Sequence, residues 1–160
     1  PDTMLQESRF VVVMEAVDNP TNLGAIVRSA AALGWDGLLL DSTSADPLAR
    51  RALRVSMGTG LSLPFARLEP GENLVTALHR HGFVTCALTP DAAADNISTV
   101  ETARAAKIAV LLGSERAGLS TDALKSAVHK VRIPMHSGTD SLNVGAAAAI
   151  ALQMLGPNAR

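Results

Sequence analysis

The stretch RFVVVMEAVDNPTNLGAIVRSAAALG, residues 9–34, combines two different hydrophobic patterns. Residues 9–17 form an almost unbroken apolar run, which is typical of a strand that is buried on both faces. After the turn-forming segment NPTN, apolar residues recur at helical spacing until Gly34, which is a frequent helix terminator. The stretch therefore predicts one strand followed by one helix.

The same alternation continues through the rest of the chain. Strands are predicted at 37–41, 61–69, 83–88, 107–113 and 130–134, and helices at 47–57, 72–82, 121–129 and 141–155. Asp46 and Pro47 form a suitable cap and first turn for the second helix, and Pro64 lacks an amide donor, which favours an edge position for its strand. Apolar strands separated by helices predict a single α/β domain, with a mostly parallel sheet and helices on both faces.

Composition limits the classes of function. The chain has 160 residues, of which 48% are hydrophobic, and this suits one domain with one core. A formal net charge of −1 argues against attraction of the whole molecule to nucleic acid, although it leaves room for a local basic patch. One Trp, three Phe and no Tyr supply few platforms for stacking the bases of single-stranded RNA.

Two features predict where the protein resides. No apolar run is long enough to cross a membrane, and no signal sequence opens the chain. The single cysteine, Cys86, lies in the apolar segment FVTCAL and is predicted to be a buried thiol rather than a nucleophile or a metal ligand. Together these features predict a soluble protein of the reducing cytoplasm.

A ligand site is predicted beyond the carboxyl ends of the strands, where open parallel sheets bind their ligands. Four polar loops are expected at this rim, at residues 18–22, 89–95, 113–118 and 134–140. The segment GTG at 58–60 lacks the third glycine of a dinucleotide loop, and GSERAG at 113–118 lacks the Lys-Ser/Thr ending of a phosphate loop. Neither NAD nor ATP is indicated, and no histidine, cysteine or acidic residues have the spacing of a metal site.

The last predicted helix begins with polar residues. Ser141 and Asn143 precede the alanine-rich run of TDSLNVGAAAAIALQML, residues 139–155. Such residues satisfy the unpaired amides of a first helical turn, so a capped core helix explains them. A cap does not explain the upstream segment IPMHSG, residues 133–138, which ends a predicted strand and opens a polar loop. This segment favours a second interpretation, because a strand, a loop and a capped helix together commonly form a ligand site.

Three segments resemble the three motifs of the SpoU/TrmH family of RNA 2′-O-methyltransferases, in the SPOUT superfamily. They are NPTNLGAIVRSAAALG (19–34), VLLGSERAGLS (110–120) and VRIPMHSGTDSLNVGAAAAIAL (131–152), they occur in the family's order, and the likeness extends over nearly the whole chain. The resemblance implies a parallel α/β domain with a carboxyl-terminal deep trefoil knot, S-adenosylmethionine bound in the knot, and a homodimer. It also raises the expectation that an RNA-recognition domain precedes Pro1.

The resemblance also implies the roles of individual residues. The residues that match the catalytic centre are Asn22, Arg28, Glu115, Ser141 and Asn143. Those that match the cofactor site are Gly113, Ile133 and Leu142, with Leu88, Thr89 and Met135 as neighbours. Two residues depart from the family pattern, since Arg116 stands where a small residue is expected and Gly145 where serine or alanine is common.

Several of these residues have a simpler structural explanation. Gly113 could end a strand in an ordinary turn, Glu115 could be a solvated loop charge, and Asn22 could cap a helix. Arg28 lies within a strongly apolar helix, where its loop context favours a phosphate contact over a solvated position. Because a guanidinium keeps its proton at physiological pH, a phosphate clamp that also stabilises a developing alkoxide is preferred over a general base.

The sequence thus predicts S-adenosylmethionine-dependent 2′-O-methylation of RNA, with ribosomal RNA favoured over transfer RNA on resemblance alone. A non-catalytic module that binds S-adenosylmethionine or RNA and a small-molecule enzyme on a similar sheet are the alternatives. The apolar helices at 22–33 and 141–155 are expected to form the homodimer interface. Arg50, Arg51 and Arg54 lie on one predicted helix, which is interpreted equally well as a solvated face or as an RNA-phosphate patch.

Overall fold

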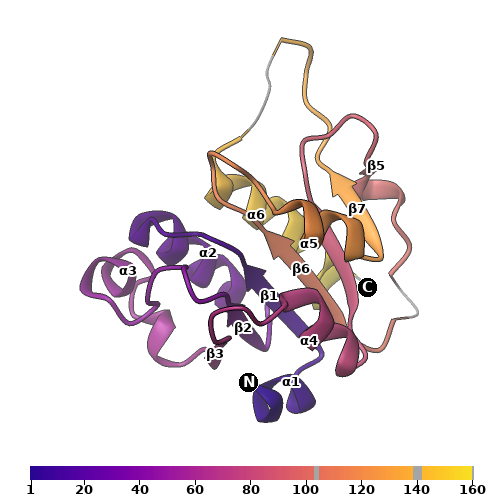
Figure 1. Ribbon diagram of the computed structural model, residues 1–160. Coiled ribbons are helices and arrows are strands. Elements are labelled where there is room, and N and C mark those ends of the chain that lie inside the picture. Colours follow the sequence, from indigo (N-terminus) through magenta and orange to yellow (C-terminus); the bar gives the residue numbers. More distant parts are fainter. Residues whose placement is uncertain (103–104, 139–141, 160) are drawn as a thin grey trace.

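A parallel sheet forms the centre of the molecule (Figure 1). The computed structural model describes residues 1–102, 105–138 and 142–159, and within them seven strands pair in the order β3-β2-β1-β6-β4-β7-β5. Every pairing is parallel, as the alternation of strands and helices predicts. The strands are β1 (Phe10–Met14), β2 (Gly37–Leu40), β3 (Phe65–Arg67), β4 (Val84–Leu88), β5 (Asp95–Asn96), β6 (Ile108–Leu112) and β7 (His129–Arg132).

Helices cover both faces of this sheet and enclose two apolar cores. Val12 and Met14 of β1 point to the face covered by α2 (Pro20–Ala32), α3 (Arg50–Val55) and α6 (Val144–Leu155). Val11 and Val13 point to the other face, which is covered by α1 (Asp2–Glu7), α4 (Leu74–Arg80) and α5 (Thr121–Ser126). All four valine and methionine side chains are fully buried, which explains why the strand is apolar at every position.

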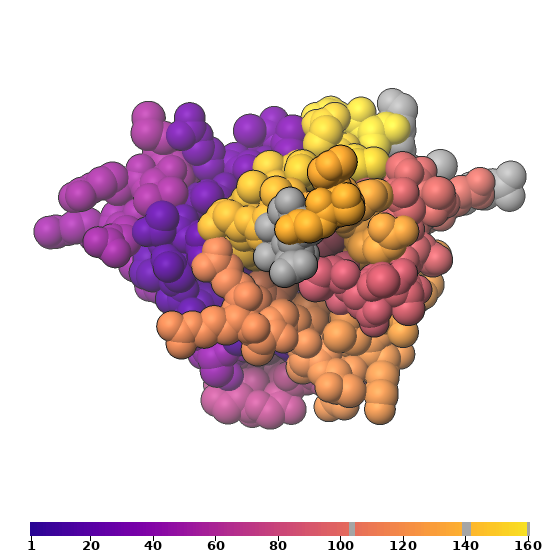
Figure 2. Space-filling view, turned by 90° about the horizontal axis from the view of Figure 1, so that it is seen from above, coloured from indigo at the N-terminus to yellow at the C-terminus, as the bar shows by residue number. Residues whose placement is uncertain are grey.

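Strand order brings distant parts of the chain together. β6 lies between β1 and β4, and β7 lies between β4 and β5, so both late strands are inserted among earlier ones. Because all the strands are parallel, the loops that follow them gather at one rim. In Figure 1 the segment after β7 rises above the strands, and Figure 2 shows the segments after β1, β6 and β7 on one surface.

Several element boundaries differ from the sequence predictions. The helix predicted over 47–57 is shorter, because residues 46–49 form a separate hydrogen-bonded turn and α3 begins at Arg50. Asp46 therefore does not cap a helix, and its carboxylate accepts from the Leu48 amide within that turn. Helix α2 begins at Pro20 with Asn19 as its cap, so Asn22 is not the cap. β3 is the edge strand that Pro64 predicted.

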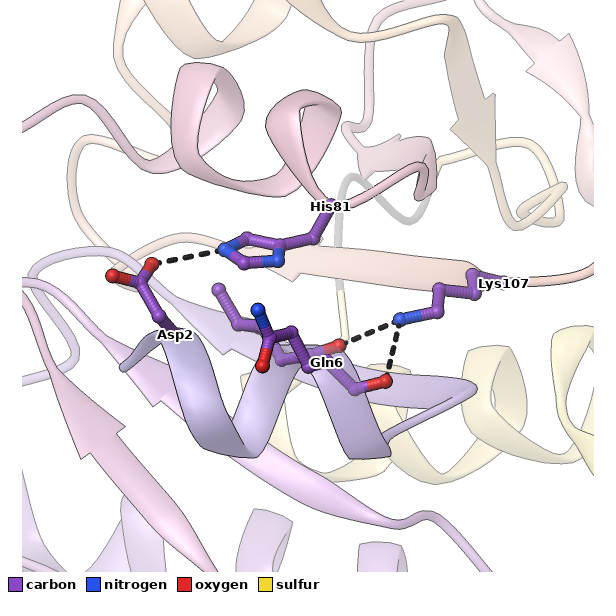
Figure 3. A network of polar contacts seen from close by, with 5 residues as sticks. Asp2, Gln6, His81 and Lys107 are labelled. Carbon is purple, nitrogen blue, oxygen red and sulfur yellow. Dashed lines mark hydrogen bonds and ion pairs between the residues drawn. The ribbon is translucent and has the colours of Figure 1, made fainter.

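Helix α1 was not predicted, and contacts with the rest of the molecule hold its single short turn (Figure 3). Leu5 is fully buried in the second core, and Lys107 Nζ donates to the carbonyls of Leu5 and Gln6 at 2.7 and 3.0 Å. The His81 ring contacts the Asp2 carboxylate at 2.9 Å, and this hydrogen bond lowers the pKa of Asp2. So short a helix depends on tertiary contacts, which local sequence patterns do not reveal.

The surroundings of Cys86 and the length of the apolar helices bear on two of the sequence predictions. Cys86 is fully buried on β4, and burial raises the pKa of its thiol to about 12, which confirms the prediction of a buried cysteine. Among the described residues, no helix combines the length and the apolar character that crossing a bilayer requires.

Candidate active site at the strand ends

The structure brings together one residue from each of the three motifs. Asn143, just before α6, donates from its Nδ2 to Glu115 Oε1 at 2.7 Å and to Asn22 Oδ1 at 3.3 Å. Glu115 lies in the loop after β6, and Asn22 lies in the first turn of α2. Three segments that are far apart in the sequence therefore meet in one polar cluster at the rim.

Helix capping fixes the orientation of the Asn143 amide. Its Oδ1 accepts from the Gly145 amide at 2.8 Å and from the Ala146 amide at 3.3 Å, so Asn143 is the N-cap of α6. Since the oxygen is held by the helix, the Nδ2 group is the one that points to Glu115 and Asn22. The two interpretations of this helix start, a cap and a ligand site, thus apply to the same residue.

A cleft of about 390 Å³ opens beside this cluster. Its lining residues come from the loop after β1, the start of α2, the loop after β6 and the start of α6: Ala16, Val17, Asp18, Asn19, Asn22, Ser114, Glu115, Arg116 and Val144. The departure from the family pattern at Arg116 therefore places a cation on the cleft wall. Gly145 lies beside the cleft, where an added Cβ would be 3.0 Å from Asn143 Oδ1 and 3.3 Å from Ala25 Cβ.

Gly113 is required by the shape of the loop that carries Glu115. A Cβ at Gly113 would lie 2.2 Å from the carbonyl carbon of Gly118 and 2.3 Å from the Leu119 amide nitrogen. The loop closes on itself here, with the Gly118 amide donating to the Ser114 carbonyl at 3.0 Å. Gly113 is therefore a point of close backbone approach and not merely a flexible turn.

Replacing Gly113 with alanine should destabilise the protein by ~3 kcal/mol, the upper end of the cost of overpacking, because backbone atoms on both sides must move. Urea unfolding measures this loss. Gly71→Ala is the comparison variant: an added Cβ there would meet nothing within 4 Å, so its smaller loss reflects only the unfavourable φ of 87°, which Gly113 does not share. Equal losses in the two variants would contradict the close-approach explanation.

The residues matched to the cofactor site lie on the neighbouring part of the same rim. Leu88 and Thr89 end β4, Gly113 follows β6, and Ile133 and Met135 follow β7, and these three strands are adjacent in the sheet. All five are half-buried, whereas Leu142, just before α6, is 38% exposed. Ser141 was predicted to be catalytic and lies outside the described residues.

Arg28 is not part of the cluster formed by Asn22, Glu115 and Asn143. It is exposed on α2, between Gly24, which packs against Ala52 of α3, and Ala25, which packs against Gly145 of α6. Its side chain is exposed to solvent, and Arg28 is not among the residues that line the cleft. The phosphate contact of Arg28 stays a prediction.

The three arginines of α3 are all exposed. Arg50, Arg51 and Arg54 have no ion pair or hydrogen bond to another side chain among the described residues. A solvated helix face and an RNA-phosphate patch both require this exposure, so both interpretations stay predictions.

A polar network joins the loop after β2 to β3 and to the loop after β1, and it was not predicted from the sequence. Asp41 and Ser44, which follow β2, accept hydrogen bonds from the loop after β1, and Arg67 of β3 donates to three carbonyls of residues 41–45. Burial raises the pKa of Asp41, but hydrogen bonds from Ser44, Thr43 and the Ala16 amide outweigh it and lower the pKa overall. An aspartate directly after a strand, followed by three hydroxyl residues, was the available signal.

Nearly the whole chain, including the segments that form the cluster, is similar to known RNA methyltransferases. The sequence profile of the SpoU rRNA Methylase family matches residues 9–153. An uncharacterised tRNA/rRNA methyltransferase of Mycobacterium tuberculosis is 43% identical over 145 residues, which cover 90% of this chain and 50% of the relative. A 23S rRNA guanosine 2′-O-methyltransferase of Bacillus subtilis is 28% identical over 94% of this chain and 59% of its own length.

Solved structures agree with the sequence relatives. The AdoMet-bound rRNA methyltransferase from Sinorhizobium meliloti superposes with a TM-score of 0.84 at 28% identity, over 94% of this chain and 59% of that one. The chain spans about half the length of the first curated relatives that it matches. The family match covers far more than half of the chain and includes all three motifs. The chain therefore belongs to the SpoU rRNA Methylase family, and its membership implies the carboxyl-terminal knot.

Proposed function

We propose that this protein transfers the methyl group of S-adenosylmethionine to a ribose 2′-hydroxyl of RNA, with ribosomal RNA as the favoured substrate class. The contact of Asn143 with Glu115 and Asn22 carries the proposal, because it joins the three family motifs beside an open cleft. The names of the relatives support it: the S. meliloti structure is that of an AdoMet-bound rRNA methyltransferase, and the B. subtilis relative acts on 23S rRNA.

The residues at the ends of β4, β6 and β7 fit the adenosine of S-adenosylmethionine. Leu88, Ile133 and Met135 are half-buried and offer apolar surface, and the backbone groups around them supply hydrogen bonds that can select adenine. When bound, S-adenosylmethionine supplies a methyl group on a positively charged sulfonium. The loop after β6 is shared, since Gly113 lies on the cofactor side and Glu115 on the cleft side.

The polar cluster has groups available to hold a ribose. Among the described residues, Glu115 Oε2 and Asn22 Nδ2 have no hydrogen-bond partner, whereas Glu115 Oε1 and Asn22 Oδ1 both accept from Asn143. The cluster can therefore accept a hydrogen bond from a hydroxyl and donate one to an oxygen. Because methyl transfer is an in-line displacement, alignment of the ribose oxygen is the main contribution of these residues.

We expect calorimetry to show binding of S-adenosylmethionine and none of NAD or ATP, because the family's cofactor residues are present and both nucleotide fingerprints are lacking. The purified protein should then transfer a labelled methyl group to ribosomal RNA in preference to transfer RNA. Glu115→Gln should retain cofactor binding and lose most of the transfer, since the exposed carboxylate supports no core contact.

Each outcome of this experiment discriminates between functions. A folded protein that does not bind S-adenosylmethionine would overturn the cofactor assignment. Binding without transfer to either RNA would favour the non-catalytic binding module, and transfer confined to transfer RNA would overturn the substrate preference alone.

We also propose that α2 and α6, which correspond to the helices predicted at 22–33 and 141–155, form a homodimer interface. Ile150 and Met154 of α6 are 37% and 38% exposed, and with Ala146 they form one apolar stripe along the helix. The outer face of α2, which packs beside α6, adds the partly exposed Ala25 and the exposed Ala32. A second copy of the chain is the occupant that covers such a self-complementary apolar face.

Light scattering at micromolar concentration should give twice the mass of the chain. Ile150→Glu, combined with Met154→Glu, should give a monomer, because two charges would be buried without partners. Leu61→Glu is the matched control, since Leu61 is 73% exposed on the 3₁₀ turn beside α3 and lies outside the proposed interface. A monomeric wild-type protein would contradict the proposed interface.

A further inference from the structure

The loop between β1 and α2 forms one wall of the cleft in a strained conformation. Ala16, Val17, Asp18 and Asn19 all line the cleft. Ala16 has a φ of 55°, in the left-handed region that a residue with a Cβ rarely adopts. Such a conformation persists only where surrounding contacts hold it.

Residues that follow β2 provide these contacts. The Ala16 amide donates to Asp41 Oδ1 at 3.1 Å, and the Val17 amide donates to Ser44 Oγ at 3.1 Å. The Ala45 amide completes the attachment by donating to the Val17 carbonyl at 2.9 Å. The wall of the cleft is thus attached through three backbone groups, the Ala16 amide and the amide and carbonyl of Val17, to a neighbouring loop that does not line the cleft.

The neighbouring loop is itself rigidly held. The Ser44 hydroxyl, in a residue only 6% exposed, contacts Asp41 Oδ1 at 2.6 Å, and Thr43 Oγ1 donates to Asp41 Oδ2 at 2.6 Å. Beneath them, the Arg67 guanidinium donates to the carbonyls of residues 41, 44 and 45 at distances of 2.9, 2.7 and 3.0 Å. This network provides a fixed support for the strained loop.

The support extends to the polar cluster through the cap of α2. Asn19 follows the strained loop, and its Oδ1 accepts from the Thr21 and Asn22 amides at 2.9 and 3.4 Å. Asn22 in turn accepts from Asn143. A change in the conformation of Ala16 would therefore move the start of α2 relative to Glu115 and Asn143.

We propose that Asp41 and Ser44 are positioning residues of the methyltransferase site, which act by holding Ala16 in its left-handed conformation and so place Asn22 in the cleft. The inference rests on the proposed function. Neither residue is matched to the family's catalytic or cofactor positions, and neither lines the cleft.

Replacing Ser44 with alanine removes the partner of the Val17 amide. The variant should lower kcat for methyl transfer by ~10- to 100-fold, the effect expected when a distant substitution displaces a reacting group, while the Kd for S-adenosylmethionine stays unchanged. Ser56→Ala is the matched control, because Ser56 is fully buried and hydrogen-bonded beside α3, away from the cleft. It should leave kcat unchanged.

Adding Ala16→Gly to Ser44→Ala tests the role of backbone strain. Glycine adopts a positive φ as readily as a negative one, so the double variant should recover most of the lost kcat. Urea unfolding of the same variants separates the two roles, because a residue that contributed only to stability would change the free energy of unfolding without changing the kcat of the folded protein. If Ser44→Ala does not fold, Asp41→Asn provides the second variant, since it keeps the size of the side chain and removes its charge.

Hydrogen exchange separates this inference from the proposed function. The amides of Ala16 and Val17 should exchange faster in Ser44→Ala than in the wild type, whether or not any RNA is methylated. Unchanged exchange, an unchanged kcat, an equal kcat loss in Ser56→Ala, or no rescue by glycine would each overturn the positioning role. A wild-type protein without methyl transfer, but with faster exchange in the variant, would overturn the proposed function instead.

Discussion

Arg28→Ala should lower the rate of methyl transfer by ~100-fold or more, the usual cost of removing one donor from a developing negative charge. Arg28 is exposed on α2 outside the cluster of Asn22, Glu115 and Asn143, so the fold and the affinity for S-adenosylmethionine should stay intact. Arg28→Lys should rescue little, because an ammonium group cannot form the planar, bidentate contact that a guanidinium makes with phosphate. Single-turnover transfer under saturating cofactor measures the effect.

Arg80→Ala provides the control for loss of an exposed arginine. Arg80 lies in the last turn of α4, on the other face of the sheet, and should be replaceable without loss of transfer. Near wild-type turnover in Arg28→Ala would refute its catalytic role. Loss of cofactor binding in a folded Arg28→Ala variant would instead place the residue in the cofactor site.

Asn143→Asp should abolish nearly all methyl transfer at neutral pH while preserving the fold. The aspartate can still cap α6, because Asp and Asn are equally good N-caps. It cannot donate to Glu115, and two carboxylates would face each other where Asn143 Nδ2 now lies 2.7 Å from Glu115 Oε1. Like charges at this distance raise the pKa of the pair, so the pair retains a proton to higher pH than either carboxyl alone.

A pH profile is therefore the decisive measurement for Asn143→Asp. As the pH falls through the raised pKa, a shared proton restores the hydrogen bond, and the activity of the variant relative to wild type should rise. Asn73→Asp is the matched control, because Asn73 caps α4 in the same manner, accepting from the Thr76 amide, and lies outside the cleft. A flat activity ratio across pH would contradict the proposed role of the Asn143 amide donor.

Much of the fold was predictable because the strands are buried on both faces. Six segments predicted β1, β2, β3, β4, β6 and β7, and parallel pairing followed from the helices between most of them. The two-residue strand β5 and the short helix α1 carry no periodic signal of their own. Leu5 holds α1 through packing, and β5 exists through its pairing with Val131 and Arg132 of β7, so both depend on contacts distant in sequence.

The candidate site was predictable only in part. The resemblance named Asn22, Glu115 and Asn143 separately, and the structure adds that one amide contacts the other two side chains. Asp41 and Ser44 were not foreseen: the segment DSTS, residues 41–44, indicates a turn, but nothing in it identifies backbone amides of another loop as the hydrogen-bond partners. The left-handed conformation of Ala16 was equally hidden, since alanine at that position suggests no turn.

The insertion of β6 between β1 and β4 also has a kinetic consequence. Phe10 pairs with Ile108, so the central pairing of the sheet must await synthesis of most of the chain and closure of a very long loop. β7 enters later still, between two strands that precede it in the sequence. The rim between β4, β6 and β7 therefore forms late, and a nascent chain lacks this ligand-binding edge until β7, residues 129–132, has left the ribosome.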